Sequence, residues 1–234
     1  MSWCRWALLI VVALLAAYVL RSWYEREIAL VIGGTYEEMR QQSSARFTSP
    51  YPGGGIWPAV PHSDVQLRFT GPQFGFITPK SAELLVVFKD DIVQSLTIHP
   101  HIEPLLLDDA LKVVLELQDQ WRRGGWIDRN HKKYPPFADT PQWRARLRDA
   151  NKGGTTYWYA GDKYQATLTV HRFEDRKHPE EERYKITLEV AKPWTPYPLP
   201  MTRPHWRYLI DSTEFVTVNW QVSPQLTQSK NKSV

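Results

Sequence analysis

Two stretches of alternating sequence decide the fold of this chain. The first reads Tyr164-Gln165-Ala166-Thr167-Leu168-Thr169-Val170-His171, and the second reads Tyr184-Lys185-Ile186-Thr187-Leu188-Glu189-Val190. Because successive side chains of a strand point to opposite faces of a sheet, each stretch predicts a strand with one buried and one wet face. We expect the two strands to lie in an antiparallel meander, joined by the charged loop 173–183.

The same meander extends upstream to a third strand and is preceded by two helices. Thr155–Tyr159 predicts the strand, which turns through Ala160-Gly161-Asp162. Apolar side chains at helical spacing predict a helix that begins near Pro104 and stops at Gly124-Gly125. A second helix begins at Thr140-Pro141, where a capping threonine precedes proline, and ends before Gly153.

In the first half of the chain and in its C-terminal tail, the sequence predicts shorter helices and strands. Thr35-Tyr36-Glu37-Glu38 matches a capping box, so we expect a helix from Thr35 to about Ala45. The segment 50–61 is rich in proline and glycine, which predicts a loop. Apolar runs predict further strands at Ile28–Ile32, Val65–Phe69, Leu84–Phe88, Ile92–Ile98, Arg207–Ile210 and Phe215–Val222.

These elements predict an α+β fold. We expect a single N-terminal transmembrane helix followed by a globular domain with a mixed or antiparallel sheet and about three helices. The chain divides into a transmembrane signal-anchor at 1–22 and a soluble α+β domain at 23–234. That domain could consist of two subdomains, 23–153 and 154–222, with a frayed tail at 223–234.

The membrane anchor is predicted from fifteen uncharged residues, Trp6 to Leu20, between Arg5 and Arg21. A full span needs about 20 residues, and a cleaved signal has a shorter apolar run, so the length lies between the two. A cut after Ala16 or Ala17 would place a leucine where a small residue is required, which favours a retained anchor. A cleaved signal and a buried helix are the alternatives. The apolar residues of the anchor are Trp6, Leu8, Leu9, Ile10, Val11, Val12, Leu14, Leu15, Val19 and Leu20.

The location that follows is the inner membrane, crossed once. An N-terminal anchor usually exports the chain behind it, so we expect the soluble domain in the periplasm. Arg5 precedes the apolar run, whereas Arg21, Arg26 and Arg40 follow it. Flanking basic residues mark the cytoplasmic side, so this distribution leaves the cytoplasmic orientation open.

The composition argues against nucleic acid as a partner. The net charge is +4, and the anchor's two arginines contribute half of it. Acidic and basic residues are interleaved along the rest, so no basic footprint for phosphates is expected. The single cysteine, Cys4, precedes the apolar run, so it forms no disulfide within the chain and is no lipoprotein cysteine.

The sequence predicts no catalytic residue and no cofactor. It contains none of the common nucleophile, phosphate-loop or metalloprotease motifs. The closest approach to a metal site is His99-Pro100-His101, because residues two apart on a strand share a face, and Asp108 or Asp109 could add an oxygen ligand. Two histidines without a defined third ligand are more typical of a strand exit, so we interpret them as solvent-exposed.

Aromatic residues in or beside the expected loops are the candidates for binding a protein partner. Large amphipathic rings anchor protein interfaces, but they are equally typical of the core of a domain with eleven tryptophans. The candidates are Trp57, Trp126, Trp158, Tyr159, Trp194 and Trp206.

Three stretches carry a resemblance to a known family. They are Gly33-Gly34-Thr35-Tyr36-Glu37-Glu38-Met39-Arg40-Gln41-Gln42, Glu103-Pro104-Leu105-Leu106-Leu107-Asp108-Asp109-Ala110-Leu111 and Leu117-Gln118-Asp119-Gln120-Trp121-Arg122. They resemble an uncharacterised family of membrane-anchored Gram-negative proteins that occurs among the accessory proteins of type VI secretion phospholipase effectors. These motifs are helix caps and helix faces, so no functional residue is carried over. The resemblance implies a non-enzymatic protein that binds another protein, as an adaptor or an immunity factor.

The expected function is therefore that of a membrane-tethered binding protein for a secreted, toxic effector. The alternatives are a metal-dependent envelope hydrolase that uses His99 and His101, and a structural subunit of an envelope complex. The sequence leaves the identity of the partner and the oligomeric state open.

Overall fold

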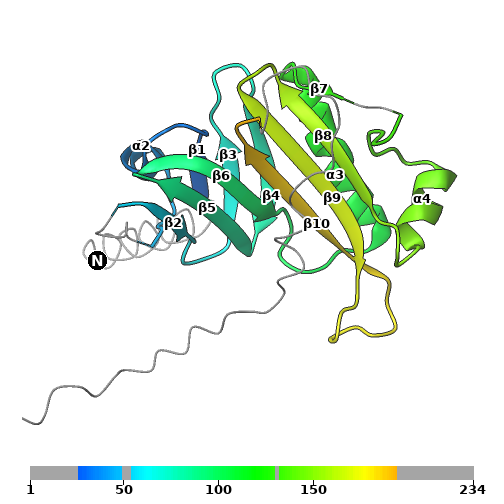
Figure 1. Cartoon of the computed structure of the whole chain (residues 1–234). Helices are drawn as coiled ribbons and strands as arrows, with labels where there is room; N and C mark the ends of the chain where they lie inside the picture. The colour runs from blue at the N-terminus through cyan, green and yellow to red at the C-terminus, as the bar shows by residue number, and fades with distance from the viewer. Residues whose placement is uncertain (1–25, 49–53, 130–131, 194–234) are drawn as a thin grey trace, which may run out of the picture. The chain divides into compact units, whose positions relative to one another are not determined.

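The computed structural model describes residues 26–48, 54–129 and 132–193 (Figure 1). All of them belong to one compact unit that ends at Tyr197. Within the described residues the chain forms ten strands in two sheets, together with three helices. The predicted α+β class, with mixed and antiparallel sheets and about three helices, is confirmed for this part of the chain.

The larger sheet has seven strands in the order β2-β5-β6-β10-β9-β8-β7, and every neighbouring pair is antiparallel. The predicted meander is confirmed as β8, β9 and β10. Strand β6 pairs with β10, so a single sheet includes strands from both sides of the possible subdomain boundary at Gly153. The bounds are β2 Ile56–Ala59, β5 Glu83–Lys89, β6 Ile92–His99, β7 Ile127–Asp128, β8 Gly154–Ala160, β9 Tyr164–Phe173 and β10 Arg183–Ala191.

The smaller sheet is mixed. Strand β3 (Val65–Phe69) lies between β1 (Glu27–Leu30), which runs parallel to it, and β4 (Phe76–Ser81), which runs antiparallel. Both edges are satisfied by side chains. The Ser44 hydroxyl accepts from the Glu27 amide at 2.8 Å, and the Gln120 side chain bonds both the amide and the carbonyl of Ile77, at 2.8 and 3.0 Å.

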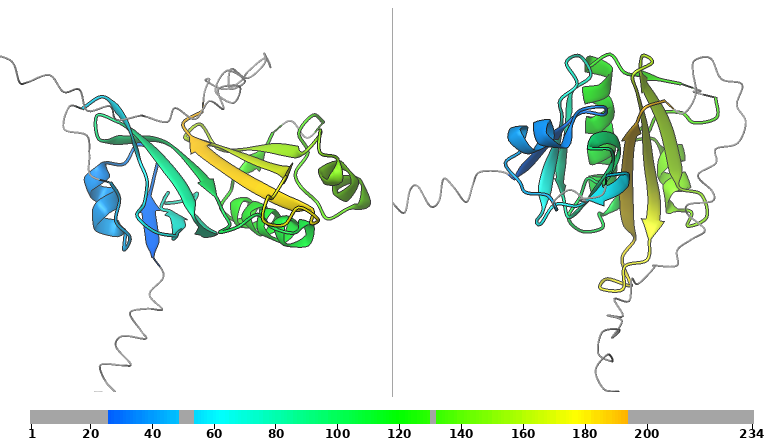
Figure 2. Two further views of the ribbon diagram at one scale, coloured as in Figure 1. Left: turned by 90° about the horizontal axis from the view of Figure 1, so that it is seen from below. Right: turned by 60° about the vertical axis from the view of Figure 1, so that its left-hand side comes forward.

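The three helices begin where their caps predict, with one exception. Helix α2 (Tyr36–Gln42) has the complete capping box of Thr35 and Glu38, and α4 (Pro141–Arg148) is capped by Thr140. Helix α3 (Leu107–Arg123) begins three residues later than Pro104, because the backbone of Leu105 pairs with that of Tyr184 instead. Helix α3 packs against β10 and β4 and covers one face of the larger sheet (Figure 2).

An aromatic cluster fills the core between the two sheets. Its centre is Trp126, whose indole nitrogen donates to the carbonyl of Phe74 at 3.1 Å. Phe69 of the smaller sheet lies 5.1 Å from Tyr164 of the larger sheet, and Phe76 lies 5.7 Å from Trp121 of α3. Edge-to-face aromatic pairs of this kind add to the free energy gained by burial, so the cluster ties the two sheets together.

Three strands were not expected: β2, β4 and the two-residue edge strand β7. Strand β2 lies inside the predicted loop 50–61, and it accommodates Pro58 because β2 is an edge strand. Strand β4 also contains a proline, Pro79, which weakens any strand signal from its sequence. The helices α2 and α4 and the strand β1 are shorter than their predicted ranges.

The N-terminal anchor and the two C-terminal strands lie outside the described residues. Among the described residues, none of the helices has the length and apolar character that a membrane span requires. The predicted span at 6–20 is therefore still a prediction.

Candidate functional site

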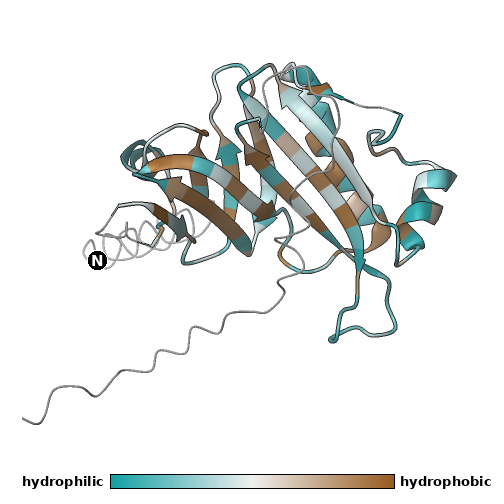
Figure 3. Ribbon diagram, viewed as in Figure 1, coloured by the Kyte–Doolittle hydropathy of each residue, from teal (hydrophilic) through white to brown (hydrophobic). Residues whose placement is uncertain are grey.

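One face of the larger sheet carries no helix in the described part of the chain. Helix α3 lies on the opposite face, behind the sheet in Figure 1. Along β8, β9 and β10 buried residues alternate with half-buried or exposed ones. Figure 3 shows the corresponding alternation of hydrophobic and hydrophilic residues as stripes on these strands. We call the outward side chains of β5, β6, β8, β9 and β10 the open face.

The strand register aligns these side chains into rows that cross five strands. One row joins Leu85, Thr97, Glu189, Thr167 and Tyr157, each paired with the next across neighbouring strands. A second row joins Val87, Ser95, Ala191, Gln165 and Tyr159. Each row has a tyrosine at its β8 end. In the middle of the first row, Thr97 and Thr167 flank Glu189, which is exposed. The centre of the open face is therefore polar and carries a carboxylate, and aromatic rings border it on the β8 side.

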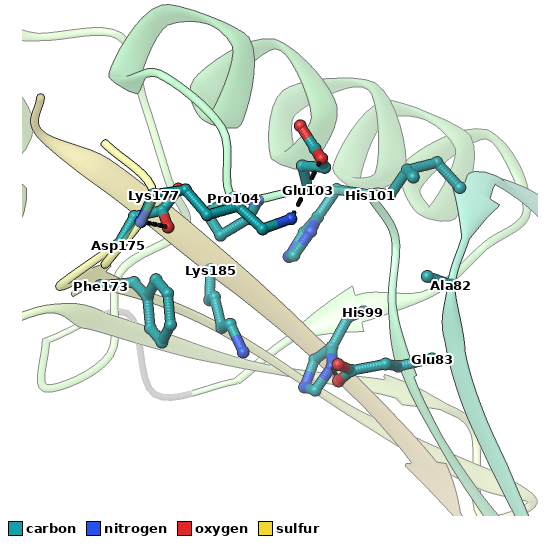
Figure 4. Close-up of a pocket in the computed structure, with 11 residues that line it drawn as sticks. Ala82, Glu83, His99, His101, Glu103, Pro104, Phe173, Asp175, Lys177 and Lys185 are labelled. Atoms are coloured by element: carbon teal, nitrogen blue, oxygen red, sulfur yellow. Dashed lines mark hydrogen bonds and ion pairs between the residues drawn. The ribbon is translucent and has the colours of Figure 1, made fainter. Parts of the chain in front are cut away.

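A cleft of about 230 Å³ lies at one end of the open face, where β5 and β10 begin and β6 and β9 end. Figure 4 shows side chains from all four strands and from the two adjoining loops around it. The residues that matter here are Glu83, His99, His101, Phe173, Lys177 and Lys185. The fold brings them together from positions a hundred residues apart in the sequence.

Charged groups in the cleft are mostly paired. Glu83 accepts a hydrogen bond from Nδ1 of His99, and Glu103 pairs with Lys177 at 3.7 Å. Lys185 differs, because its ammonium lies 4.3 Å from the centre of the Phe173 ring. No carboxylate among the described residues forms an ion pair with Lys185, so its contact is of the cation–π type.

His101 forms the inner wall of the cleft and is only 7% exposed. Its Nε2 accepts a hydrogen bond from the amide of Ile186 at 3.1 Å, so the proton of the neutral ring is on Nδ1. Burial, and then the charges of His99 and Lys185, lower the pKa of His101 to about 4. The Nδ1 atom is buried and has no hydrogen-bond partner among the described residues.

This protonation state opposes the metal site that His99 and His101 could form. A metal ion needs a lone pair, which His101 directs at the Ile186 amide through Nε2, while Nδ1 carries the proton. The two rings are 6.0 Å apart, and no group of three His, Cys, Asp or Glu side chains in the described residues could hold a metal ion. The expectation that both histidines are solvent-exposed is also wrong for His101, because the loop after β6 folds back onto β10.

The aromatic candidates for partner binding are placed differently from one another. Trp57, Trp126 and Trp158 are 4%, 3% and 1% exposed, so these three rings are core residues and are not available as surface anchors. Tyr159 lies half-buried at the border of the open face, with the guanidinium of Arg129 4.6 Å from its ring centre. Trp194 and Trp206 lie outside the described residues.

The sequence did not predict the open face. Of the two tyrosines at its border, Tyr159 is among the candidates named from the sequence and Tyr157 is not. The alternation in β9 and β10 was used to predict which side chains are buried. The threonines between them point the other way and form part of the open face. No sequence motif predicts the pairing of Glu83 with His99, because this pairing depends on the register of β5 and β6. No protein-family model matches this chain, and comparisons with curated proteins and with solved structures give no match either.

Proposed function

We propose that this chain is a non-enzymatic, membrane-tethered protein that binds a partner protein through the open face. The observation that carries the proposal is the five-strand row of Leu85, Thr97, Glu189, Thr167 and Tyr157 on a face that no described helix covers. The row presents a carboxylate between two threonines, which gives a partner polar groups to bind, and tyrosines such as Tyr157 are enriched in protein interfaces.

The border residues of the open face support this role. Leu85 is 38% exposed and Ile127 of the edge strand β7 is 59% exposed. Ile127 pairs with Tyr159, so an apolar and an aromatic side chain lie next to each other at this border. Glu189 is exposed in the middle of the face, and desolvation by the surrounding residues raises the pKa of its carboxyl.

The physiological role that we propose is that of an adaptor or an immunity factor for a type VI secretion effector of the phospholipase type. It rests on the family resemblance of residues 33–42, 103–111 and 117–122 and on the predicted anchor at 6–20. The anchor would keep the binding domain at the inner membrane, with the periplasmic side favoured and the cytoplasmic side as the alternative.

The test is affinity purification of the tagged full chain from its native membranes, followed by mass spectrometry. We expect one protein to be recovered in stoichiometric amount, and we expect Thr167→Arg to abolish its recovery. The matched control is Ala145→Arg, which places the same charge on the exposed surface of α4. Recovery of no stoichiometric partner, or equal recovery with both variants, would exclude the proposal.

Deletion of the gene separates the two roles. Loss of effector secretion identifies an adaptor, and sensitivity to the effector identifies an immunity factor. If deletion affects neither, and the detergent-extracted protein elutes as a large assembly of envelope proteins, the structural-subunit alternative is correct. A reporter fused after Val234 determines the side of the membrane.

A further inference from the structure

The cleft at the end of the open face contains a buried hydrogen-bond donor without an acceptor. This donor is the Nδ1–H of His101, whose other ring nitrogen is held by the Ile186 amide. Leaving a buried polar group unpaired is costly, and such groups are rare in folded proteins. A group that enters the cleft and accepts this hydrogen bond would remove the cost.

A cation without a carboxylate partner lies at the same cleft. The ammonium of Lys185 is in contact with the Phe173 ring and with no carboxylate among the described residues. Lys185 pairs with His171 across β10 and β9. Burial, and then the charge of Lys185, lowers the pKa of His171. Figure 4 shows Lys185 and His99 directed toward the same space below His101.

The carboxylates of the cleft already have donors. Glu83 accepts from His99, Glu103 pairs with Lys177, and the Asp175 carboxylate accepts from the Lys177 amide at 2.9 Å. None of them is bonded to the His101 donor. The cleft therefore combines a cation and a buried donor that both lack an oxygen acceptor from the described part of the chain.

We propose that this cleft binds a carboxylate group, whose two oxygens accept from Lys185 and from Nδ1–H of His101. The apolar wall formed by Phe173, Ile102 and Pro104 suits the hydrocarbon part that carries the carboxylate. Because Nδ1 of His101 is buried, the cleft must open as the carboxylate enters. The Lys177–Glu103 pair at the cleft is an exposed contact that gives way at little cost.

The chemistry favours a carboxylate over the other anions and over a metal ion. A phosphate dianion would meet three carboxylates with only one uncommitted cation, whereas a monoanion matches the charge of Lys185. Two oxygens on one carbon can accept from two converging donors, as carboxylates commonly do. A metal ion would need the lone pair that the proton on His101 Nδ1 removes.

The carboxylate has two possible sources, a protein and a small acid. A partner could supply its C-terminus or an acidic side chain, and a free carboxylic acid presents the same group. The inference goes beyond the proposed partner binding and does not depend on it. It concerns the cleft at the end of the open face, whereas the proposed partner binding concerns the row through Thr167, and it uses a different measurement.

The test is nuclear magnetic resonance of the histidine side chains in the full chain, purified in a mild detergent and labelled with ¹⁵N. The probes are sodium acetate, N-acetyl-triglycine with a free C-terminus, the same peptide as its C-terminal amide, and N-acetylglutamate α-amide, whose side-chain carboxylate is free. Sodium chloride at equal ionic strength and inorganic phosphate are the comparators. We expect a saturable downfield shift of the His101 Nδ1 proton with the carboxylates and none with the peptide amide.

The variant Lys185→Met keeps an unbranched side chain, one heavy atom shorter than lysine, and removes its charge, and we expect at least tenfold weaker binding. The control Lys163→Met removes an exposed charge at the turn between β8 and β9, at the other end of the sheet, and should leave the affinity unchanged. The ranking of the acetate, C-terminal and side-chain probes identifies the source of the carboxylate.

Three results would overturn the proposal. They are the absence of any saturable shift, an equal shift with the peptide amide, and tighter binding of phosphate than of every carboxylate. The comparison of acid with amide uses the unaltered chain, so it decides the question even if Lys185→Met does not fold.

Discussion

The two sheets of this domain differ in what covers them. Side chains bond to the edge strands of the smaller sheet, whereas one face of the larger sheet has no described helix on it. The smaller sheet closes its edges with side chains, Ser43 and Ser44 at β1 and Gln120 at β4. The larger sheet leaves a whole face without a helix in the described residues. Unpaired backbone at an edge invites non-specific strand pairing, whereas an open face offers only side chains. If the domain binds a partner as we propose, this difference predicts that side chains of the larger sheet make the contact.

The largest effect is expected where the two sheets meet. Trp126→Ala removes a ring that touches Phe69, Phe74 and Trp121, and we expect it to lower the free energy of unfolding by about 3–5 kcal/mol. Because the cluster couples the sheets, both should unfold in one transition. Urea denaturation followed by circular dichroism measures the loss, and Trp126→Phe is the milder comparison. Two separate transitions in the unaltered chain would contradict the coupling.

Much of the larger sheet could be predicted, because its strands alternate strictly. The pattern of β9 and β10 places Leu168 and Leu188 on the buried side without further information. Strand β4 could not be predicted, because Pro79 interrupts it and its pairing depends on β3. The burial of Trp57 depends on its stacking on Phe88, 4.4 Å away, and that contact exists only once β2 pairs with β5.

The site was less predictable than the fold. The two histidines were found as a pair, but their roles depend on partners distant in the sequence, Glu83 for His99 and Ile186 for His101. Strand register determines these pairings, and a single sequence does not contain the register between β6 and β10. Likewise, the row through Thr167 exists only because five strands are aligned.

The second largest effect on stability is expected from a comparison of two glutamine side chains of α3, one buried and one at the surface. Gln118 of α3 is fully buried and bonds both the amide and the carbonyl of Phe137, at 2.8 and 2.9 Å. Gln118→Leu leaves both groups unpaired, and we expect a loss of about 3 kcal/mol. Gln120 makes the same two bonds with Ile77 at the surface, where water can replace them, so Gln120→Leu should cost about 1 kcal/mol or less.

Thermal unfolding of the two glutamine variants side by side tests this contrast. Gln120→Leu should additionally promote self-association, because it uncovers the β4 edge, and light scattering measures this. Equal losses of stability would mean that the edge of the smaller sheet is as inaccessible to water as its interior, and the comparison of the two sheets would fail.

The third effect is the pH dependence of the cleft. The pKa of His101 is lowered from 6.5 to about 4, chiefly by burial and then by His99 and Lys185, while Glu83 acts in the opposite direction. Between these values the unfolded chain binds a proton that the folded chain does not. Stability should therefore be complete above pH 6.5 and fall toward pH 4, by at most about 3 kcal/mol.

Denaturation at a series of pH values, with His101→Phe and His62→Gln compared, isolates this contribution. His101→Phe loses the bond to Ile186 and is less stable overall, but its stability should depend less on pH in this range. His62 is exposed, so His62→Gln should keep the original slope. An unchanged slope in His101→Phe would show that other groups, such as His171, carry the pH dependence.

The smallest effect on stability is expected at the open face, and it is the sharpest test of the comparison. Thr167 is half-buried in the centre of the face, so Thr167→Arg can direct its charge into water and should cost about 0.5 kcal/mol or less. Partner capture should nevertheless be lost, because a long charged side chain prevents close approach to the sheet. A substitution that leaves the melting temperature unchanged and abolishes binding would separate recognition from folding. If Thr167→Arg instead destabilises the domain as much as Gln118→Leu does, the face is covered in the whole protein and its side chains serve the core.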